Sequence, residues 1–224
     1  AINREINKTL KQLEKTLGQI SKKLDWDNSA LLDRILMLYY VRNIVMLEYR
    51  NRTWEYEFMA FSRRIGEIWE PFCTLCFEYP VNDIEFFIPP TFSEVKSHLK
   101  QEIEEYINQL SISPSQKTDL KDYYDKVWSL VSSGEIKLEL DLHFTDVNGA
   151  RVNVDFKSGF GSNEKGNTNR LLMVATVYDN VAQGDFHNLL LVRSNEDQNN
   201  NDFQTLKNSG VWEAHCGEST YERL

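Results

Sequence analysis

Hydrophobic and polar positions follow a helical period through the first half of the chain. In residues 2–24 the apolar side chains recur at steps of three and four, which predicts a helix with a narrow apolar seam. Such a seam fits either the next helix of the same chain or a coiled-coil-like dimer contact. Asp27, Asn28 and Ser29 offer an N-cap for a second helix. That helix is apolar on more than one face, so we expect it to lie centrally.

Further helices are expected before the period changes. A third helix is predicted to begin near Thr53, and Pro71 should kink or restart it. A short extended piece at residues 86–90 leads to amphipathic helices over residues 93–110 and 115–132. We therefore expect a helical N-terminal region at residues 1–52, for packing or dimerisation, and a core at residues 53–224.

After Gly134 the hydrophobic period changes from helical to two. Apolar side chains hold the even positions of residues 135–144, so Glu139, Asp141 and His143 share the other face of a predicted strand. Asn148 and Gly149 mark a turn, beyond which the alternation continues. Residues 135–158 are therefore predicted to form a β-hairpin with one apolar and one polar face.

The alternation also fixes which residues of the hairpin face each other. A three-residue loop at 147–149, with Gly149 in the left-handed conformation, keeps the two faces consistent because a slip by one residue would exchange them. In this register Leu142 pairs with Val154 and Leu140 with Phe156. Two further pairs lie on the polar face: Asp141 with Asp155, and Glu139 with Lys157.

Two aspartates directly opposite on a sheet repel each other unless a cation lies between them. Mg²⁺ is suited to this position, since it binds carboxylate oxygens and completes its shell with water and phosphate oxygens. Lys157 shares the face of Asp155 and is placed to orient or deprotonate an attacking water. The alternative is an ordinary amphipathic hairpin with a solvated face, on which Glu139 and Lys157 form a surface pair.

Asp141, followed on the next strand by Asp155, Phe156 and Lys157, resembles the signature of the PD-(D/E)xK nuclease superfamily, although Leu140 stands where that motif has proline. Upstream, residues 64–70 look like the Gly-x-x-x-Glu element by which many restriction endonucleases bring another acidic residue to the site. Glu70 matches its glutamate, with Glu67 as the second choice. The resemblance covers residues 64–193.

The resemblance implies an α/β (α+β) restriction-endonuclease-like core, with a central mixed sheet flanked by helices and preceded by the helical N-terminal region. It implies a Mg²⁺-dependent endonuclease in which Asp141 and Asp155 hold the metal and Lys157 and Glu70 assist catalysis. A type II enzyme of a restriction–modification system would be a homodimer cutting double-stranded DNA at a specific sequence. The alternatives are a repair or recombination nuclease of the same superfamily, and a noncatalytic helical adaptor or oligomerisation protein.

The segment after Lys157 is rich in groups that contact DNA. Residues 158–170 are polar and are expected to form a loop that contacts phosphates and base edges. Its candidate DNA-binding residues are Lys165, Asn167, Asn169 and Arg170. Beyond it, the pattern predicts a buried helix at residues 171–178, a buried strand at 188–193, and a last strand at 211–216.

The charge balance bears on the DNA hypothesis. Asp and Glu number 34 against 25 Lys and Arg, a net charge of −9, which counts against a nonspecific polyanion binder. A nuclease cleft needs only a locally basic face, however, and a bound metal neutralises its carboxylates. No apolar run is long enough for a membrane helix and no signal-peptide core precedes the first helix, so we expect an intracellular, cytoplasmic protein without a membrane partner.

Two other site chemistries receive little support. The chain has three cysteines, an odd number that does not suit a disulfide framework. Cys73 and Cys76 could combine with His215 and Cys216 in a zinc site, but they lie among apolar residues where buried free cysteines are usual. No glycine-rich loop has the spacing of a nucleotide-binding motif.

Overall fold

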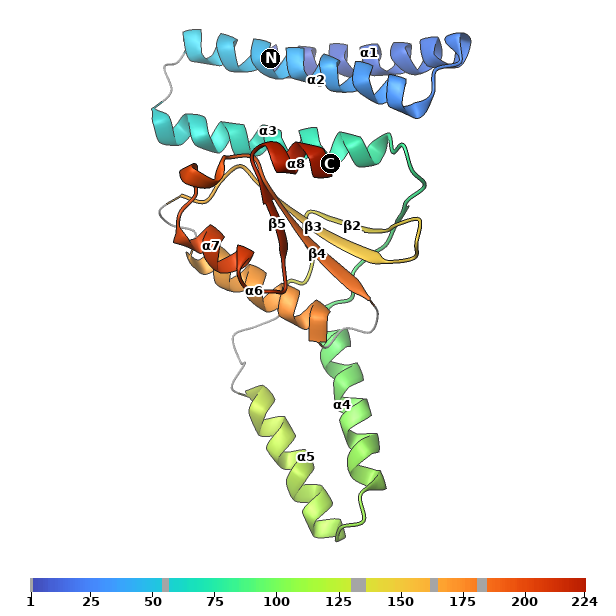
Figure 1. Ribbon diagram of the computed structural model, residues 1–224, viewed down its shortest axis with the longest axis vertical. Coiled ribbons are helices and arrows are strands. Elements are labelled where there is room, and N and C mark those ends of the chain that lie inside the picture. The colour runs from blue at the N-terminus through green and yellow to red at the C-terminus, as the bar shows by residue number, and fades with distance from the viewer. Residues whose placement is uncertain (1, 54–56, 130–135, 162–164, 181–184) are drawn as a thin grey trace.

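The computed structural model describes residues 2–53, 57–129, 136–161, 165–180 and 185–224. It is a mixed α/β structure in which helices come first and a five-stranded mixed sheet is flanked by helices, so the predicted fold class is confirmed. Figure 1 shows the sheet in the middle, with helical layers on one side and a helical hairpin projecting from the other. Over these described ranges, no helix combines the length and apolarity needed to cross a bilayer.

The N-terminal helices form a layer of their own. α1 (Ile2–Leu24) and α2 (Asn28–Thr53) lie side by side against α3 (Phe58–Glu78), which separates them from the sheet (Figure 1). Asp27 caps α2, because its Oδ1 accepts a hydrogen bond of 2.7 Å from the Ala30 amide. Tyr39 donates across the pair to Glu14 at 2.9 Å. α1 therefore packs on α2 within the chain and Leu10 of its seam is buried, whereas Leu13 and Leu24 of the seam are exposed, so both interpretations stay open for the seam as a whole.

α3 covers one face of the sheet along its whole length. Its predicted start near Thr53 borders residues 54–56, which lie outside the described part of the chain; the helix as seen begins at Phe58. Pro71 lies inside the helix without ending it, so of the two predicted outcomes the restart is wrong and the kink stays a prediction. Trp69 and Cys73, on either side of Pro71, are buried against the sheet. This packing holds the helix together across a residue that lacks a backbone donor.

α4 (Phe92–Gln109) and α5 (Pro114–Ser129) form the projecting hairpin of Figure 1. Thr91 and Glu94 form a reciprocal capping box at the start of α4. Both predicted helices are confirmed, apart from residues 130–132 of the second, which fall outside the described ranges.

The sheet has the strand order β1-β2-β3-β4-β5. β1 (Glu85–Phe86), β2 (Leu142–Thr145) and β3 (Arg151–Lys157) are antiparallel neighbours. β3, β4 (Phe186–Val192) and β5 (Glu213–Cys216) are parallel, connected through α6 (Lys165–Asn180) and α7 (Asn201–Lys207). A 3₁₀ turn (Glu196–Gln198) precedes α7, and α8 (Glu218–Arg223) follows β5. The carboxyl ends of the three parallel strands consequently share one edge, the usual place for a site in such sheets.

The hairpin turn has the predicted geometry. The Asp146 amide donates to the Ala150 carbonyl at 2.9 Å, and Gly149 has a φ of 83°, which only glycine adopts without strain. Leu142 pairs with Val154, as the register required.

The predicted strand at 135–144 is largely wrong, since only the part from Leu142 onward pairs with a neighbouring strand and Glu135 falls outside the described residues. Leu138 and Leu140 are buried in the core under α6, whereas Phe144 is buried in the core under α3. The chain therefore crosses from one face of the sheet to the other at Asp141. Asp141–Asp155, Glu139–Lys157 and Leu140–Phe156 are not ladder pairs.

The alternative interpretation, an ordinary hairpin with a solvated polar face, does not hold for His143, Asn153 and Asp155, because α6 covers them. His143 Nδ1 and Asn153 Oδ1 lie 2.8 Å apart, and Asn153 Nδ2 donates to Asn188 Oδ1 at 2.9 Å. All three side chains are buried. His143 Nε2 accepts the Leu140 amide at 2.9 Å, so its proton lies on Nδ1 and points to Asn153. This chain of hydrogen bonds satisfies polar groups that the fold has taken out of water.

Replacing Asn153 should destabilise the protein. The Asn153→Ala change leaves the His143 donor and the Asn188 acceptor without partners in the core, at an expected cost of about 2–4 kcal/mol in the free energy of unfolding. Urea unfolding followed by circular dichroism measures it. Asn180→Ala, at an exposed position in α6, is the control and should change stability by less than about 0.5 kcal/mol. Equal stability of the two variants would contradict the role given to the network.

Candidate active site

Asp155 and Lys157 lie at the carboxyl end of β3, on the face covered by α6. Asp155 is 1% exposed, and its Oδ1 forms an ion pair with Lys157 Nζ. The lysine amine is partly exposed and also donates to the Phe156 carbonyl at 3.3 Å. The pair therefore consists of a buried carboxylate beside an amine that water can reach.

Asp141 lies at the crossing point before β2. Its Oδ2 accepts the Phe156 amide at 2.7 Å, where an ordinary ladder would supply a carbonyl from the neighbouring strand. The segment leading to it is held by side chains: Tyr178 Oη donates to the Leu138 carbonyl and Arg170 Nη2 to the Glu139 carbonyl, at 3.0 and 2.8 Å. Asp141 is thereby fixed beside β3 without a ladder partner, and its negative charge acts on Asp155.

α3 brings Glu70 to the same place. A Cβ built on Gly66 would lie 3.4 Å from Ser158 Oγ, an ordinary contact distance, so the helix lies against the end of β3 at this position. Glu70 lies one turn further on the same helix face, where it interacts electrostatically with Asp141 and Lys157. Glu67 instead forms an ion pair with Arg64. Of the two acidic candidates on α3, Glu70 is the one directed to the site.

Burial and like charge disfavour the ionised form of two carboxyls in the cluster. Burial raises the pKa of Asp155 to about 6, and the Asp141 carboxylate adds to this effect, although Lys157 opposes it. Burial also raises the pKa of Glu70, with a further contribution from Asp141. A cation bound beside these carboxyls would lower both pKa values.

The donor set suits a hard divalent cation. Within the described ranges, no three His, Cys, Asp or Glu side chains gather closely enough to hold a metal by themselves. Asp141 and Asp155 would supply one or two oxygen ligands, and water and phosphate oxygens the others, which is the habit of Mg²⁺. The same finding leaves Cys73, Cys76, His215 and Cys216 unassembled as a zinc site; burial raises the pKa of the Cys73 thiol, and His215 contacts Glu213.

The residues predicted to contact DNA belong to a helix rather than a loop. Residues 165–170 form the first turns of α6, while 162–164 lie outside the described ranges. Polar residues form helix here because Thr168 and Leu171 are buried against the sheet. Lys165 and Asn169 are exposed, one turn apart on one side of the helix. Asn167 is half-buried. Arg170 donates a hydrogen bond to the Glu139 carbonyl, and its positive charge favours the ionised form of Asp155.

The structure adds residues at the end of β4 that the sequence reasoning missed. The Arg193 amide donates to the Lys157 carbonyl at 2.9 Å, and the Ser194 amide to the Ser158 carbonyl at 3.2 Å. Arg193 therefore lies beside Lys157 and adds a cation to this edge of the sheet. The sequence held one signal for this position. Two apolar runs that read as buried strands are expected to pair in parallel, and parallel pairing sets their carboxyl ends side by side.

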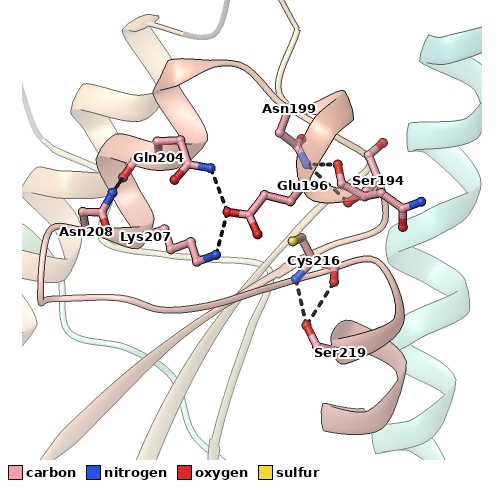
Figure 2. Close-up of polar contacts among 9 residues, drawn as sticks. Ser194, Glu196, Asn199, Gln204, Lys207, Asn208, Cys216 and Ser219 are labelled. Carbon is pink, nitrogen blue, oxygen red and sulfur yellow. Dashed lines mark hydrogen bonds and ion pairs between the residues drawn. The ribbon is translucent and has the colours of Figure 1, made fainter.

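The segment beyond Ser194 is held firmly by polar contacts. Figure 2 shows Glu196 accepting from Gln204 and Lys207, at 2.9 and 2.7 Å, and Asn199 donating to the Ser194 carbonyl at 3.2 Å. At the end of β5, the Cys216 amide donates to Ser219 Oγ at 3.2 Å. These contacts fix the connections that border the carboxyl edge of the sheet.

Comparison with known proteins adds no assignment: no protein-family model, curated protein or solved structure matches the chain. The case for a function therefore depends on the geometry and chemistry of the residues themselves.

The raised pKa of Asp155 predicts a pH-dependent stability in the absence of divalent cations. Because folding raises this pKa from 3.8 to about 6, the native state binds a proton more tightly than the unfolded state. Relative to Asp155→Asn, the free energy of unfolding of the wild type should therefore fall as pH rises from 4 to 6, and level off above 7. The shift corresponds to a change of roughly 3 kcal/mol.

Urea unfolding of both proteins with a chelator, at several pH values, checks this prediction. The variant is the control for every other titrating group, since only the difference between the two curves is used. A difference that does not change between pH 4 and pH 7 would contradict the burial of an ionisable carboxylate at this position.

Proposed function

We propose that this protein is a Mg²⁺-dependent endodeoxyribonuclease of the PD-(D/E)xK superfamily, of the type II restriction type. The observation that carries the proposal is the convergence of Glu70, Asp141, Asp155 and Lys157 from three separate segments at one edge of the sheet. Such a mixture of one buried carboxylate, two more accessible carboxylates and a partly exposed amine suits hydrolysis of a phosphodiester bond.

In this mechanism Asp141 and Asp155 hold the metal, which when bound acidifies a water ligand and stabilises negative charge on the phosphate. Lys157 Nζ would orient the attacking water and stabilise the negative charge that develops on the phosphate oxygens. For this the amine gives up part of its ion pair with Asp155. The water oxygen would form the new bond to phosphorus and pass its proton to solvent, and the ester oxygen opposite it would leave with the bonding electron pair and take a proton from a solvent water. Glu70 would assist from α3 by binding a water or the ion.

Activity should depend on these residues and on the metal. With plasmid DNA and Mg²⁺, we expect Asp155→Asn and Lys157→Met to lower the cleavage rate by at least about 100-fold. Glu70→Gln should lower it by about tenfold, since its exposed side chain is partly screened by solvent. Chelation should abolish cutting, and added Mg²⁺ should restore it.

Glu67→Gln is the matched control, because it makes the same change one turn away on the same helix; its rate should stay within about twofold of the wild type. Near wild-type cutting by both Asp155→Asn and Lys157→Met would end the nuclease proposal.

DNA binding should involve the first turns of α6. Lys165 is exposed near the site, so Lys165→Ala should weaken binding similarly for all sequences and reduce the slope of log affinity against log salt by about 1. Fluorescence anisotropy in Ca²⁺ at several salt concentrations measures the slope. Lys23→Ala on α1, which lies on the far side of α3, should leave it unchanged. Equal slopes for wild type and Lys165→Ala would remove this lysine from the interface.

Digestion of phage DNA distinguishes between the two kinds of nuclease. Discrete fragments support a restriction enzyme, whereas a smear or structure-dependent cutting supports a repair or recombination nuclease. A noncatalytic adaptor would bind no Mg²⁺ in calorimetry.

A further inference from the structure

α2 has an apolar side that nothing in the described chain covers. Its exposed apolar residues lie 44% to 60% open to solvent. They are Met37, Tyr40, Val41, Ile44, Val45 and Tyr49, and are named here the α2 stripe. Their steps of three and four set them along one side of the helix, while Ile35 and Met46 on the other side are buried.

A helix that is apolar on more than one face normally has each of those faces covered. α1 and α3 cover only part of α2, and Figure 1 shows α2 in the layer furthest from the sheet. Isolated exposed apolar residues need no explanation, but a contiguous row over more than three helical turns marks an interaction surface. The question is what occupies it.

The charges at the ends of the stripe favour a second copy of this chain. Arg34 precedes the stripe and Glu48 lies near its far end. Both are exposed, while within the chain Arg34 lies over the Trp26 ring and Glu48 forms an ion pair with Arg52. If two α2 helices run antiparallel with Val41 opposite itself, Met37 faces Val45 and Arg34 faces Glu48 of the partner. Each end then carries an opposite-charge pair, and the surface is complementary to itself, as a two-fold dimer requires.

The area also fits. Half-exposed side chains of this size offer roughly 100 Å² each, so pairing two stripes buries about 1,200 Å², the lower limit of stable dimers. A lipid surface fits less well, because a membrane-bound helix carries mainly Lys and Arg beside its apolar side. Here Asp33 and Glu48 accompany Arg34 and Arg52.

We infer that the α2 stripe is a homodimer interface in which the α2 helices of two copies pack antiparallel about a two-fold axis at Val41. This interface is independent of the site at the sheet edge, and it uses α2 rather than the α1 seam.

Sedimentation equilibrium of the full chain tests the inference. The wild type should be a dimer at micromolar concentration, and Val41→Glu should raise the dissociation constant at least about 100-fold, because it sets two carboxylates together at the axis. Val45→Glu should act in the same direction. Val127→Glu is the matched control: it makes the same change at an exposed valine of α5 and should leave the dimer intact. Circular dichroism of each variant checks that its helices are retained.

The charge pair tests the direction of pairing. Arg34→Glu and Glu48→Arg should each weaken the dimer by about tenfold, and the double variant should return to within about threefold of the wild type. A monomeric wild type, or a Val41→Glu protein that dimerises as tightly as wild type, overturns the inference. Failure of the double variant to recover overturns the antiparallel arrangement. Because the readout is mass, none of these results depends on whether the protein cuts DNA.

Discussion

β3 is buried on both faces, and the other features of the site depend on that constraint. An ordinary half-exposed strand would leave Asn153, Asp155 and Lys157 in water. With α3 on one side and α6 on the other, each polar side chain must find its partner inside the protein. Asn153 does so through His143 and Asn188, while Asp155 relies on a single lysine at the end of the strand. Asn153, with two partners, is therefore a structural polar group, whereas Asp155, with one partner, remains available for chemistry.

Much of this could be predicted from the sequence. Helix positions follow from the three-and-four spacing of apolar residues, and the hairpin loop follows from Gly149 and the parity of its flanks. The alternation of the hairpin and its resemblance to the nuclease signature singled out Asp141, Asp155 and Lys157, and the structure brings the three residues together at the end of β3. The conformation of the chain around Asp141 was not predictable, because strict alternation also fits a chain that crosses from one apolar core to another. Likewise, residues 165–170 were expected to be a loop from their polarity, whereas burial of Thr168 decides for helix.

The two halves of the chain differ in which side chains they enclose. In the sheet of the C-terminal half, the polar residues Asn153, Asn188 and Asp155 are enclosed and paired. In the N-terminal half, apolar residues of α2 are left open, and the outer layer lacks the cover that its composition requires. A buried ionisable group such as Asp155 favours a chemical role, and an uncovered apolar row such as the α2 stripe favours association. Both surfaces are thus located by the same rule, that each side chain needs a suitable environment.

The hydrogen bond from the Phe156 amide to Asp141 Oδ2 gives this carboxylate a structural task. Through it the side chain holds the crossing segment beside β3, at a point where no ladder bond from the neighbouring strand reaches the amide. A side chain without an acceptor at this position would leave the Phe156 amide unpartnered. The charge at residue 141 and the path of the backbone are therefore linked, because one side chain sets both.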